Sequence, residues 1–141
     1  MPAIQFFEED ISYKLKNKAN VRKWITSTII EEGFQLEELT YVFCSDEYLL
    51  QINQQYLDHD TYTDIITFDN SEEEGLIIGD IFISVDRIKE NAAKFTVSVE
   101  KELHRVMIHG ALHLLGYKDK SAADKKKMTL KEDFYLDKRG F

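Results

Sequence analysis

The sequence predicts a single α/β domain of the α+β kind, in which helices cover a small mixed β-sheet. The chain has 141 residues, of which 43% are hydrophobic and 31% charged, as in one ordinary globular domain. Strand-like and helical segments are mixed along it without strict βαβα alternation, and one acidic turn of hairpin length predicts an antiparallel pair. We find no repeat, linker or low-complexity region, so residues 1–141 are expected to form one domain.

The first half of the chain predicts two strands and two helices. Residues 4–10 (IQFFEED) predict a short strand. The next segment predicts an amphipathic helix that ends at Gly33, because its buried-type side chains recur every three or four positions. These side chains are Val21, Trp24, Ile25, Thr28 and Ile29. Residues 36–46 (LEELTYVFCSD) predict a second strand, and residues 46–60 predict a helix with Asp46 as its N-cap.

The second half predicts a hairpin followed by three helices. Residues 63–70 (TDIITFDN) and 75–84 (GLIIGDIFIS) predict two strands joined by the turn SEEE. The second of them could line a substrate cleft as an edge strand, and its Asp80 needs a hydrogen-bonding partner. Helices are predicted over residues 85–95, over residues 98–115, and from about Ser121 onward.

Composition excludes several classes of protein. A single cysteine, Cys44, rules out a disulfide framework and a cysteine-rich zinc site, and in an apolar strand it is expected to be buried. The N-terminus has no basic region ahead of an apolar run, and no apolar run is long enough to span a bilayer. We therefore expect a cytoplasmic protein without a membrane partner.

The net charge of −8 is unevenly distributed along the chain. Residues 24–86 contain fifteen acidic residues and no lysine or arginine, whereas residues 87–141 contain thirteen basic and eight acidic residues, a balance of +5. One side of the molecule could therefore accept a polyanion. The run Lys125, Lys126 and Lys127 is the candidate phosphate contact, and its alternative role is a solvated helix face.

The segment MIHGALHLLGYKDK, from Met107, carries the candidate chemistry. His109 and His113 lie four residues apart on a predicted helix, so they project from one face within reach of a single ion. His104 lies about 180° from His113 around that helix, which leaves it exposed or in a packing role. Two histidines at this spacing are a weak signal, because a core histidine can equally bond to a backbone carbonyl.

The residues after the helix strengthen the prediction of a metal site. Gly116 can adopt a left-handed conformation that turns the chain back, so that Asp119 would reach the open side of the ion. The pattern H-x-x-x-H-x-x-G-x-x-D has the spacing of the extended zincin signature, whose three ligands leave a position for water. Gly110 stands where a protease has its general-base glutamate, which disfavours peptide hydrolysis. Alternatively, Asp119 could pair with a neighbouring lysine.

Two blocks of sequence resemble the YbeY family, the metal-dependent endoribonucleases of bacterial rRNA maturation. HGALHLLGYKD, from His109, resembles the family's H-G-x-L-H-L-x-G-Y-D-H, and NQQYLDHDTYTDIITF, from Asn53, resembles N-x-x-Y-R-x-x-D-x-x-T-D-V-L-S-F. GDIFIS resembles the family's G-D-I strand. Two differences bear on the site: Asp119 stands at the position of the family's third histidine, and Leu57 replaces an arginine placed near the cleft.

The resemblance implies a fold, an activity and a set of site residues. The fold is a zincin (metalloprotease)-like domain with the histidine helix packed against the sheet. The activity is that of a single-strand-preferring endoribonuclease in 16S rRNA 3′-end maturation, ribosome assembly and quality control, with rRNA of the small ribosomal subunit as partner. The metal ligands would be His109, His113 and Asp119, which would hold one Zn²⁺ per chain or, given the harder aspartate oxygen, another divalent ion.

The difference at Leu57 leaves other functions open. Without the arginine a bidentate phosphate contact is lost, and His59 could replace it in part as a catalytic proton carrier or phosphate donor, or be an exposed loop residue. The chain could instead be a ribosome-assembly factor that binds RNA and holds a mainly structural metal. A zincin-type peptidase is the third hypothesis, and Gly110 argues against it.

Overall fold

The computed structural model describes residues 3–58 and 61–141. Within these ranges the strands are β1 (Ile4–Glu9), β2 (Gln35–Cys44), β3 (Ile65–Asp69) and β4 (Leu76–Ser84). The helices are α1 (Lys18–Glu31), α2 (Asp46–Leu57), α3 (Val85–Phe95), α4 (Val99–Leu114) and α5 (Ala122–Asp137). The strands form one sheet in the order β1-β2-β4-β3, in which β3 runs antiparallel to β4 and the other neighbours are parallel. The predicted α/β fold with a mixed sheet is confirmed.

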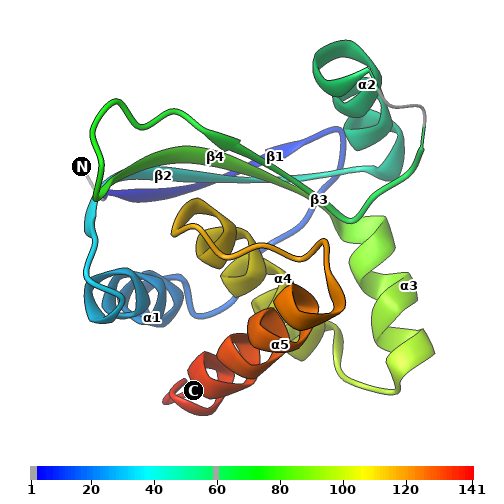
Figure 1. The fold of residues 1–141 in the computed structure, drawn as a ribbon. Helices are drawn as coiled ribbons and strands as arrows, with labels where there is room; N and C mark the ends of the chain where they lie inside the picture. Colours follow the sequence, from blue (N-terminus) through cyan, green and yellow to red (C-terminus); the bar gives the residue numbers. More distant parts are fainter. Residues whose placement is uncertain (1–2, 59–60) are drawn as a thin grey trace.

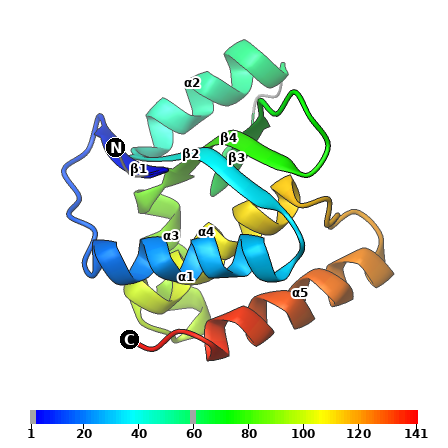
Figure 2. The ribbon, with the colours of Figure 1, turned by 90° about the vertical axis from the view of Figure 1, so that its left-hand side faces the viewer.

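The helices form layers on the two sides of this sheet. Figure 1 shows α1, α4 and α5 below the sheet and α2 above it, and the turned view in Figure 2 shows the same layers. Helix α4 lies directly under β3 and β4, and α5 packs against α4 on the side away from the sheet. Among the described residues, no helix is both long and apolar enough to cross a bilayer.

The main core lies between the sheet and the helices α1 and α4. Alternate residues of β4 face it, as the period of two in a strand requires, and Ile77, Ile81 and Ile83 are buried there. The five side chains predicted for the inner face of α1 are all buried. The hydroxyl of Tyr41 donates to the carbonyl of Met107 at 2.9 Å, which ties the middle of the sheet to α4.

Gly110 lets α4 approach the sheet closely. A Cβ atom at this position would lie 2.8 Å from Cδ1 of Ile65 on β3 and 3.1 Å from two side-chain atoms of Ile81 on β4. A side chain larger than hydrogen would therefore have to displace these isoleucine side chains or move the helix away from the strands. The missing glutamate of the protease signature thus has a structural explanation, because the position faces the sheet.

Several local predictions are confirmed. Ser98 and Ser121 cap α4 and α5, each accepting a backbone N–H of the first turn at 3.0 Å. Asp80 has a side-chain partner, since Asn70 Nδ2 donates to its Oδ2 at 3.0 Å. Cys44 is fully buried, and burial raises the pKa of its thiol to about 12, so it is a packing residue with little thiolate at neutral pH.

Two local predictions are wrong. The N-cap of α2 is Ser45, whose extended backbone lets Oγ accept the N–H of Tyr48, while Asp46 lies in the first turn and pairs with Arg87. Strand β4 is internal, because the hairpin places β3 outside it at the edge. Of the two roles expected for His104, exposure and packing, the packing role is confirmed, because Trp24 and the C-terminal Phe141 cover its ring and leave 0% of its surface accessible.

Candidate metal centre

Helix α4 brings His109 and His113 to one face near its C-terminal end. They lie one turn apart, and the centroids of their rings are 4.6 Å from each other. Both side chains are partly buried, with exposed fractions of 21% and 26%. The pair therefore lies at the rim of the core, where a ligand can reach it from solvent.

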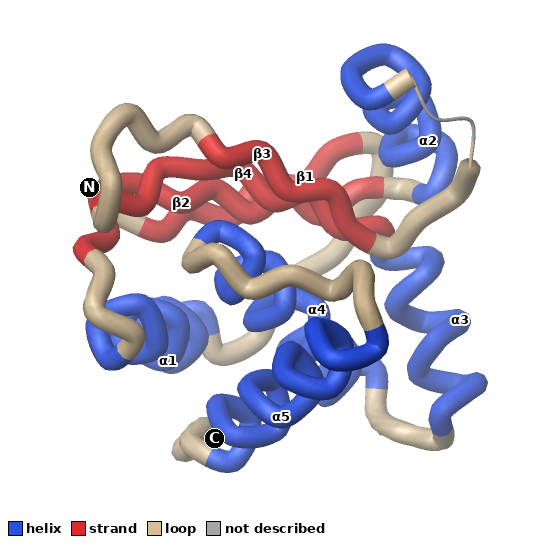
Figure 3. The backbone as a smooth tube through the Cα atoms, viewed as in Figure 1, coloured by secondary structure: helices blue, strands red, loops and turns tan. Residues whose placement is uncertain are grey.

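A glycine turn returns the chain to these histidines. Gly116 has φ of 102°, and its N–H donates to the carbonyl of His113 at 3.0 Å, while the N–H of Tyr117 donates to the carbonyl of Leu112 at 3.1 Å. These two bonds define a Schellman motif, which ends a helix with a left-handed residue. The following loop runs back along α4 (Figure 3) and carries Asp119 to the imidazole rings.

The three polar side chains meet at distances typical of shared metal ligands. Asp119 Oδ2 lies 3.4 Å from His109 Nε2 and 3.3 Å from His113 Nε2, and one ligand atom from each residue lies within 4.8 Å of the others. Bonds of about 2.0–2.2 Å at tetrahedral angles separate two ligands of one Zn²⁺ by about 3.3 Å. Charge-assisted hydrogen bonds are shorter, about 2.7–2.9 Å. The group could therefore hold a divalent ion.

The exposure and pairing of Asp119 fit the same arrangement. Its side chain is 42% exposed, which leaves one side of the group open to solvent. Within the described residues its ion-pair contacts are with the two histidines, and not with the neighbouring Lys118 or Lys120. The structure therefore does not contain the alternative arrangement, a surface ion pair between Asp119 and a neighbouring lysine.

The Nδ1 atoms of both histidines bond to acceptors on the far side of the rings. His113 Nδ1 lies 2.9 Å from the carbonyl oxygen of Tyr117, and His109 Nδ1 lies 2.6 Å from Oε2 of Glu132 on α5. Because a carbonyl can only accept, the hydrogen of neutral His113 is on Nδ1, and its Nε2 lone pair is directed at Asp119. Acceptors on the non-ligating nitrogen fix ring orientation in metal sites.

Glu132 is itself held in place by a salt bridge. Arg105 Nη1 donates to Glu132 Oε1 at 2.9 Å, and its Nη2 donates to Asp133 Oδ1 at 2.7 Å.

Burial acts to lower the pKa of His109, but its hydrogen bond with Glu132 and the charge of that carboxylate outweigh it, so this pKa is above its ordinary value. Below this raised pKa, an ion that binds here would have to displace a proton from His109.

Two further acids belong to this charged group: the partly buried Asp64, whose charge acts on His109, and the buried Glu102, which interacts with Asp64 and Glu132. Burial raises the pKa of Asp64, the residue before β3, and that of Glu102 on α4, and the charge of Asp64 raises the latter further. Asp64 belongs to the second block of family resemblance, but the resemblance gave it no role. Glu102 and Glu132 were not predicted. Glu132 had a usable signal, because it falls in line with the inward-facing Met128, Tyr135 and Leu136 of α5.

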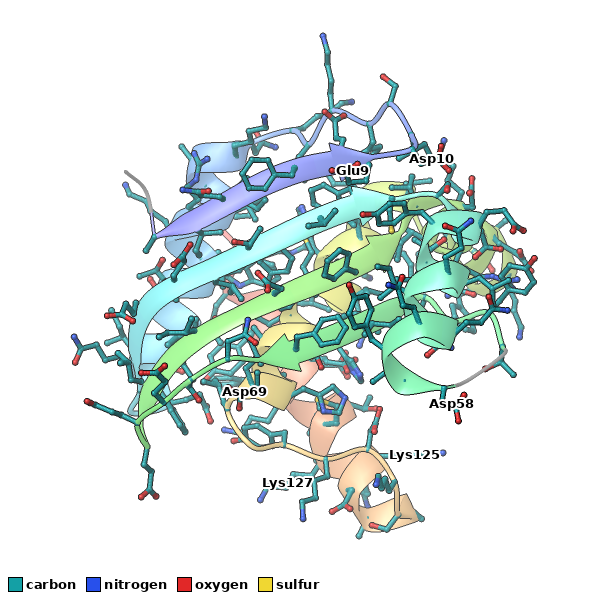
Figure 4. All side chains as sticks on the ribbon, turned by 90° about the horizontal axis from the view of Figure 1, so that it is seen from above. Glu9, Asp10, Asp58, Asp69, Lys125 and Lys127 are labelled. Atoms are coloured by element: carbon teal, nitrogen blue, oxygen red, sulfur yellow. The ribbon has the colours of Figure 1, made fainter. Side chains whose placement is uncertain are left out.

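The lysine run lies on the first turns of α5. Lys125, Lys126 and Lys127 are all exposed. Figure 4 labels Lys125 and Lys127, which point to different sides of the helix beyond the β3 edge of the sheet. Lys127 Nζ lies 5.5 Å from the ring centroid of Tyr117, so this lysine is next to the loop that carries Asp119. His59 lies outside the described residues.

The position of the family's arginine is beside the edge strand. Leu57, at the end of α2, is 41% exposed and lines a hollow of 380 Å³. The other lining residues are Asn53, Thr61, Tyr62, Thr63, Ile65, Ile66 and Thr67. Asn53 Nδ2 donates to the carbonyl of Thr61 at 2.8 Å, so Asn53 ties α2 to the described segment that precedes β3.

Comparison with known proteins decides the family. A family model described as Endoribonuclease YbeY matches residues 3–140, which is nearly the whole chain. This chain belongs to the YbeY family. The family resemblance and the fold expected from it are confirmed.

Relatives and a solved structure agree with this membership. A YbeY endoribonuclease of Cytophaga hutchinsonii is 55% identical over 138 residues, covering 98% of this chain and 96% of the relative. A YbeY endoribonuclease of Flavobacterium psychrophilum is 50% identical over 127 residues, covering 90% of each chain. A solution structure of a protein from Thermotoga maritima superposes with a TM-score of 0.66 at 29% identity, covering 95% of this chain and 87% of that one.

Proposed function

We propose that this YbeY-family chain is a metal-dependent endoribonuclease that hydrolyses RNA phosphodiester bonds, with residues 1–141 as one catalytic domain. The observation that carries the proposal is the meeting of two imidazole Nε2 atoms and one carboxylate oxygen at 3.3 and 3.4 Å. The relatives named Endoribonuclease YbeY support the reaction type. We propose single-stranded segments of rRNA in the small ribosomal subunit, near the 16S 3′ end, as the substrate, and the cytoplasm as the place of action.

The donor set fits one Zn²⁺ held by His109, His113 and Asp119. When bound, the ion would polarise a phosphate oxygen and lower the pKa of a water in its open position. The protein's own contribution is orientation, since the Tyr117 carbonyl and Glu132 fix the two rings. The aspartate oxygen is a harder ligand than a third imidazole, so Mn²⁺ or another divalent ion is the alternative occupant.

Substrate contacts are proposed for the lysines of α5 and for His59. Lys127 is the best placed of Lys125, Lys126 and Lys127, because it adjoins Tyr117 in the loop that carries Asp119. A phosphate bound there would lie beside the proposed metal centre, where the scissile bond must be. His59 is proposed as a proton carrier or phosphate donor that takes over part of the role of the arginine replaced by Leu57.

Replacing one proposed ligand tests the function. We expect wild-type protein purified without chelator to contain one divalent ion per chain and to cleave a single-stranded rRNA fragment. His113→Ala should lose most of the ion and at least about 100-fold in cleavage rate, because two ligands cannot hold the ion in place. Lys89→Ala, an exposed lysine on α3, is the control and should cleave normally. Equal cleavage by His113→Ala and wild type would refute the proposal.

Leu57 favours one alternative function. An exposed leucine offers no donor to phosphate, so the chain could bind rRNA as an assembly factor with a mainly structural metal. Metal-loaded wild-type protein that binds the rRNA fragment but leaves it intact would support this alternative. A peptidase has no such support, because Gly110 faces the sheet and leaves no room for the general-base glutamate.

A further inference from the structure

Glu32 forms a partly buried junction between three parts of the fold. It follows α1 directly, and only 11% of its side chain is exposed. Its Oε1 accepts the hydroxyl of Tyr117 at 2.6 Å, and its Oε2 accepts Lys131 Nζ at 3.1 Å and the hydroxyl of Tyr135. One carboxylate thus connects α1 with α5 and with the loop that follows the histidine helix.

Tyr117 connects this junction to the candidate ligands. Its carbonyl accepts Nδ1 of His113 at 2.9 Å, and its hydroxyl donates to Glu32. Tyr117 also lies two residues before Asp119 in the same loop. Its two ends are therefore fixed in different ways: the backbone belongs to the turn around His113, and the ring is held by a carboxylate from the other end of the sequence.

The bond between Tyr117 and Glu32 is one of the contacts that hold the loop after α4 in place. Lys118 and Lys120, on either side of Asp119, are exposed. Among the contacts that hold the loop are the Schellman bonds at its start, the packing of the Tyr117 ring against the core, and the bond between Tyr117 and Glu32. The Schellman bonds set the direction of the turn, whereas the bond to Glu32 holds the ring of the residue whose carbonyl faces His113.

We propose that Glu32 is a positioning residue for the metal centre, acting through Tyr117 to hold the carbonyl that orients His113 and the loop that carries Asp119. The inference rests on the proposed metal ligation. Glu32 is not itself one of the candidate ligands His109, His113 and Asp119, and it acts only on how they are held. Its effect should therefore appear in metal affinity. Partners of this indirect kind typically change metal affinity by about 10–100-fold, and we expect the lower end for one hydrogen bond.

The chain offers a matched pair of variants for the test. Tyr117→Phe and Tyr135→Phe each remove one hydroxyl from the same carboxylate, but only Tyr117 belongs to the metal loop. The dissociation constant for Zn²⁺ would be measured without RNA by competition with a chromophoric chelator, and the absorption spectrum of bound Co²⁺ would report ligand geometry. We expect Tyr117→Phe to bind Zn²⁺ about tenfold more weakly with an altered Co²⁺ spectrum. Tyr135→Phe should stay within about twofold of wild type.

Two further variants complete the design. Glu32→Gln keeps an oxygen that can accept the Tyr117 hydroxyl and should bind Zn²⁺ more tightly than Glu32→Ala does. Glu132→Gln, which weakens the bond to His109 directly, is the positive control. If Tyr117→Phe fails to fold, the two Glu32 variants decide the matter by the same measurement.

The outcomes separate this inference from the proposed function. Unchanged Zn²⁺ affinity in Tyr117→Phe and Glu32→Ala would overturn the inference, and so would an equal loss in Tyr117→Phe and Tyr135→Phe, which would mean a general loosening of the contact between α1 and α5. Wild-type protein that binds no divalent ion would overturn both. Protein that binds Zn²⁺ in the expected order but cleaves no RNA would refute only the nuclease activity.

Discussion

His104 is a buried titratable side chain that the candidate metal centre does not use. Its Nδ1 lies 2.7 Å from Arg139 Nη1, so it accepts that hydrogen bond and carries its own hydrogen on Nε2. Within the described residues, this buried Nε2 has no hydrogen-bond partner. The ring packs between Trp24 and Phe141. Burial, and then the charge of Arg139, lowers its pKa to about 4 from an ordinary value of 6.5.

This shift predicts a loss of stability in mild acid. Between these two pKa values, His104 is protonated in the unfolded chain and neutral in the folded chain. Its contribution to the free energy of unfolding is therefore fully present above pH 6.5 and is lost as the pH falls towards 4. At about pH 5 the loss from His104 is about 2 kcal/mol. Urea unfolding of the metal-free protein at about pH 7.5 and pH 5 measures it. His104→Gln should lose about 2 kcal/mol less than wild type between these conditions, and equal losses would contradict the prediction.

The sequence predicted the surroundings of some individual residues but not of others. The association of His109, His113 and Asp119 was predictable, because helix geometry and one glycine turn specify it over eleven residues. The part played by Glu132 was not, because it depends on how α5 lies across α4. The sequence left His104 either exposed or packed for the same reason: the covering residues Arg139 and Phe141 come from a distant part of the sequence.

At the scale of elements, the crossing of α4 under β3 and β4 depends on Gly110. In Gly110→Ala, the new methyl would overlap Ile65 and Ile81, while alanine gains about 1 kcal/mol in helix propensity. We expect a net loss of about 1 kcal/mol in unfolding free energy, measured in urea.

The same overlap predicts a specific rescue. Ile65→Val removes the Cδ1 atom that a Cβ at Gly110 would meet at 2.8 Å, so Gly110→Ala should cost about 1 kcal/mol less in that background. Gly140→Ala, where a Cβ would meet nothing within 4 Å, should leave stability unchanged. Additive effects of the substitutions at 65 and 110 would show that the helix does not depend on this contact.

The sequence predicted which segments are helices and which are strands, but it did not predict which strands lie next to each other in the sheet. Hydrophobic spacing indicated the strands and helices, including the buried face of α1. It could not show that β4 is internal, because strand order depends on crossovers that leave no local pattern. Ser45 and Asp46 are both good caps, and the extended backbone of Ser45 decides between them.

At the scale of the whole molecule, the uneven charge bears on RNA binding. The acidic stretch 24–86 includes the second half of α1 and all of β2, α2, β3 and β4, whereas the basic excess lies in α3, α4, α5 and their connections. A polyanion should therefore approach the helical side that carries Lys127. The chain can bind RNA there despite its net charge of −8.

This placement predicts a salt dependence that one lysine changes. Binding of a single-stranded rRNA fragment, measured by fluorescence anisotropy in the presence of chelator, should weaken as salt rises from about 50 to 200 mM. Lys127→Ala should lower the slope of log affinity against log salt by about 0.7, the value for one contact to a single strand. Lys89→Ala should leave the slope unchanged. A slope that is the same in both variants would place the RNA elsewhere.

The bond between Glu132 and His109 means that a fragment can contain all three candidate ligands and still lack a correctly oriented metal site. All three candidate ligands lie in α4 and the loop after it, whereas the carboxylate that orients one of them belongs to α5. A protease cut between Lys120 and α5 would leave every ligand in its fragment and remove the group that aligns His109. Proteolytic fragments and gene truncations in this family should therefore be judged by whether α5 is retained as well as by the histidine motif.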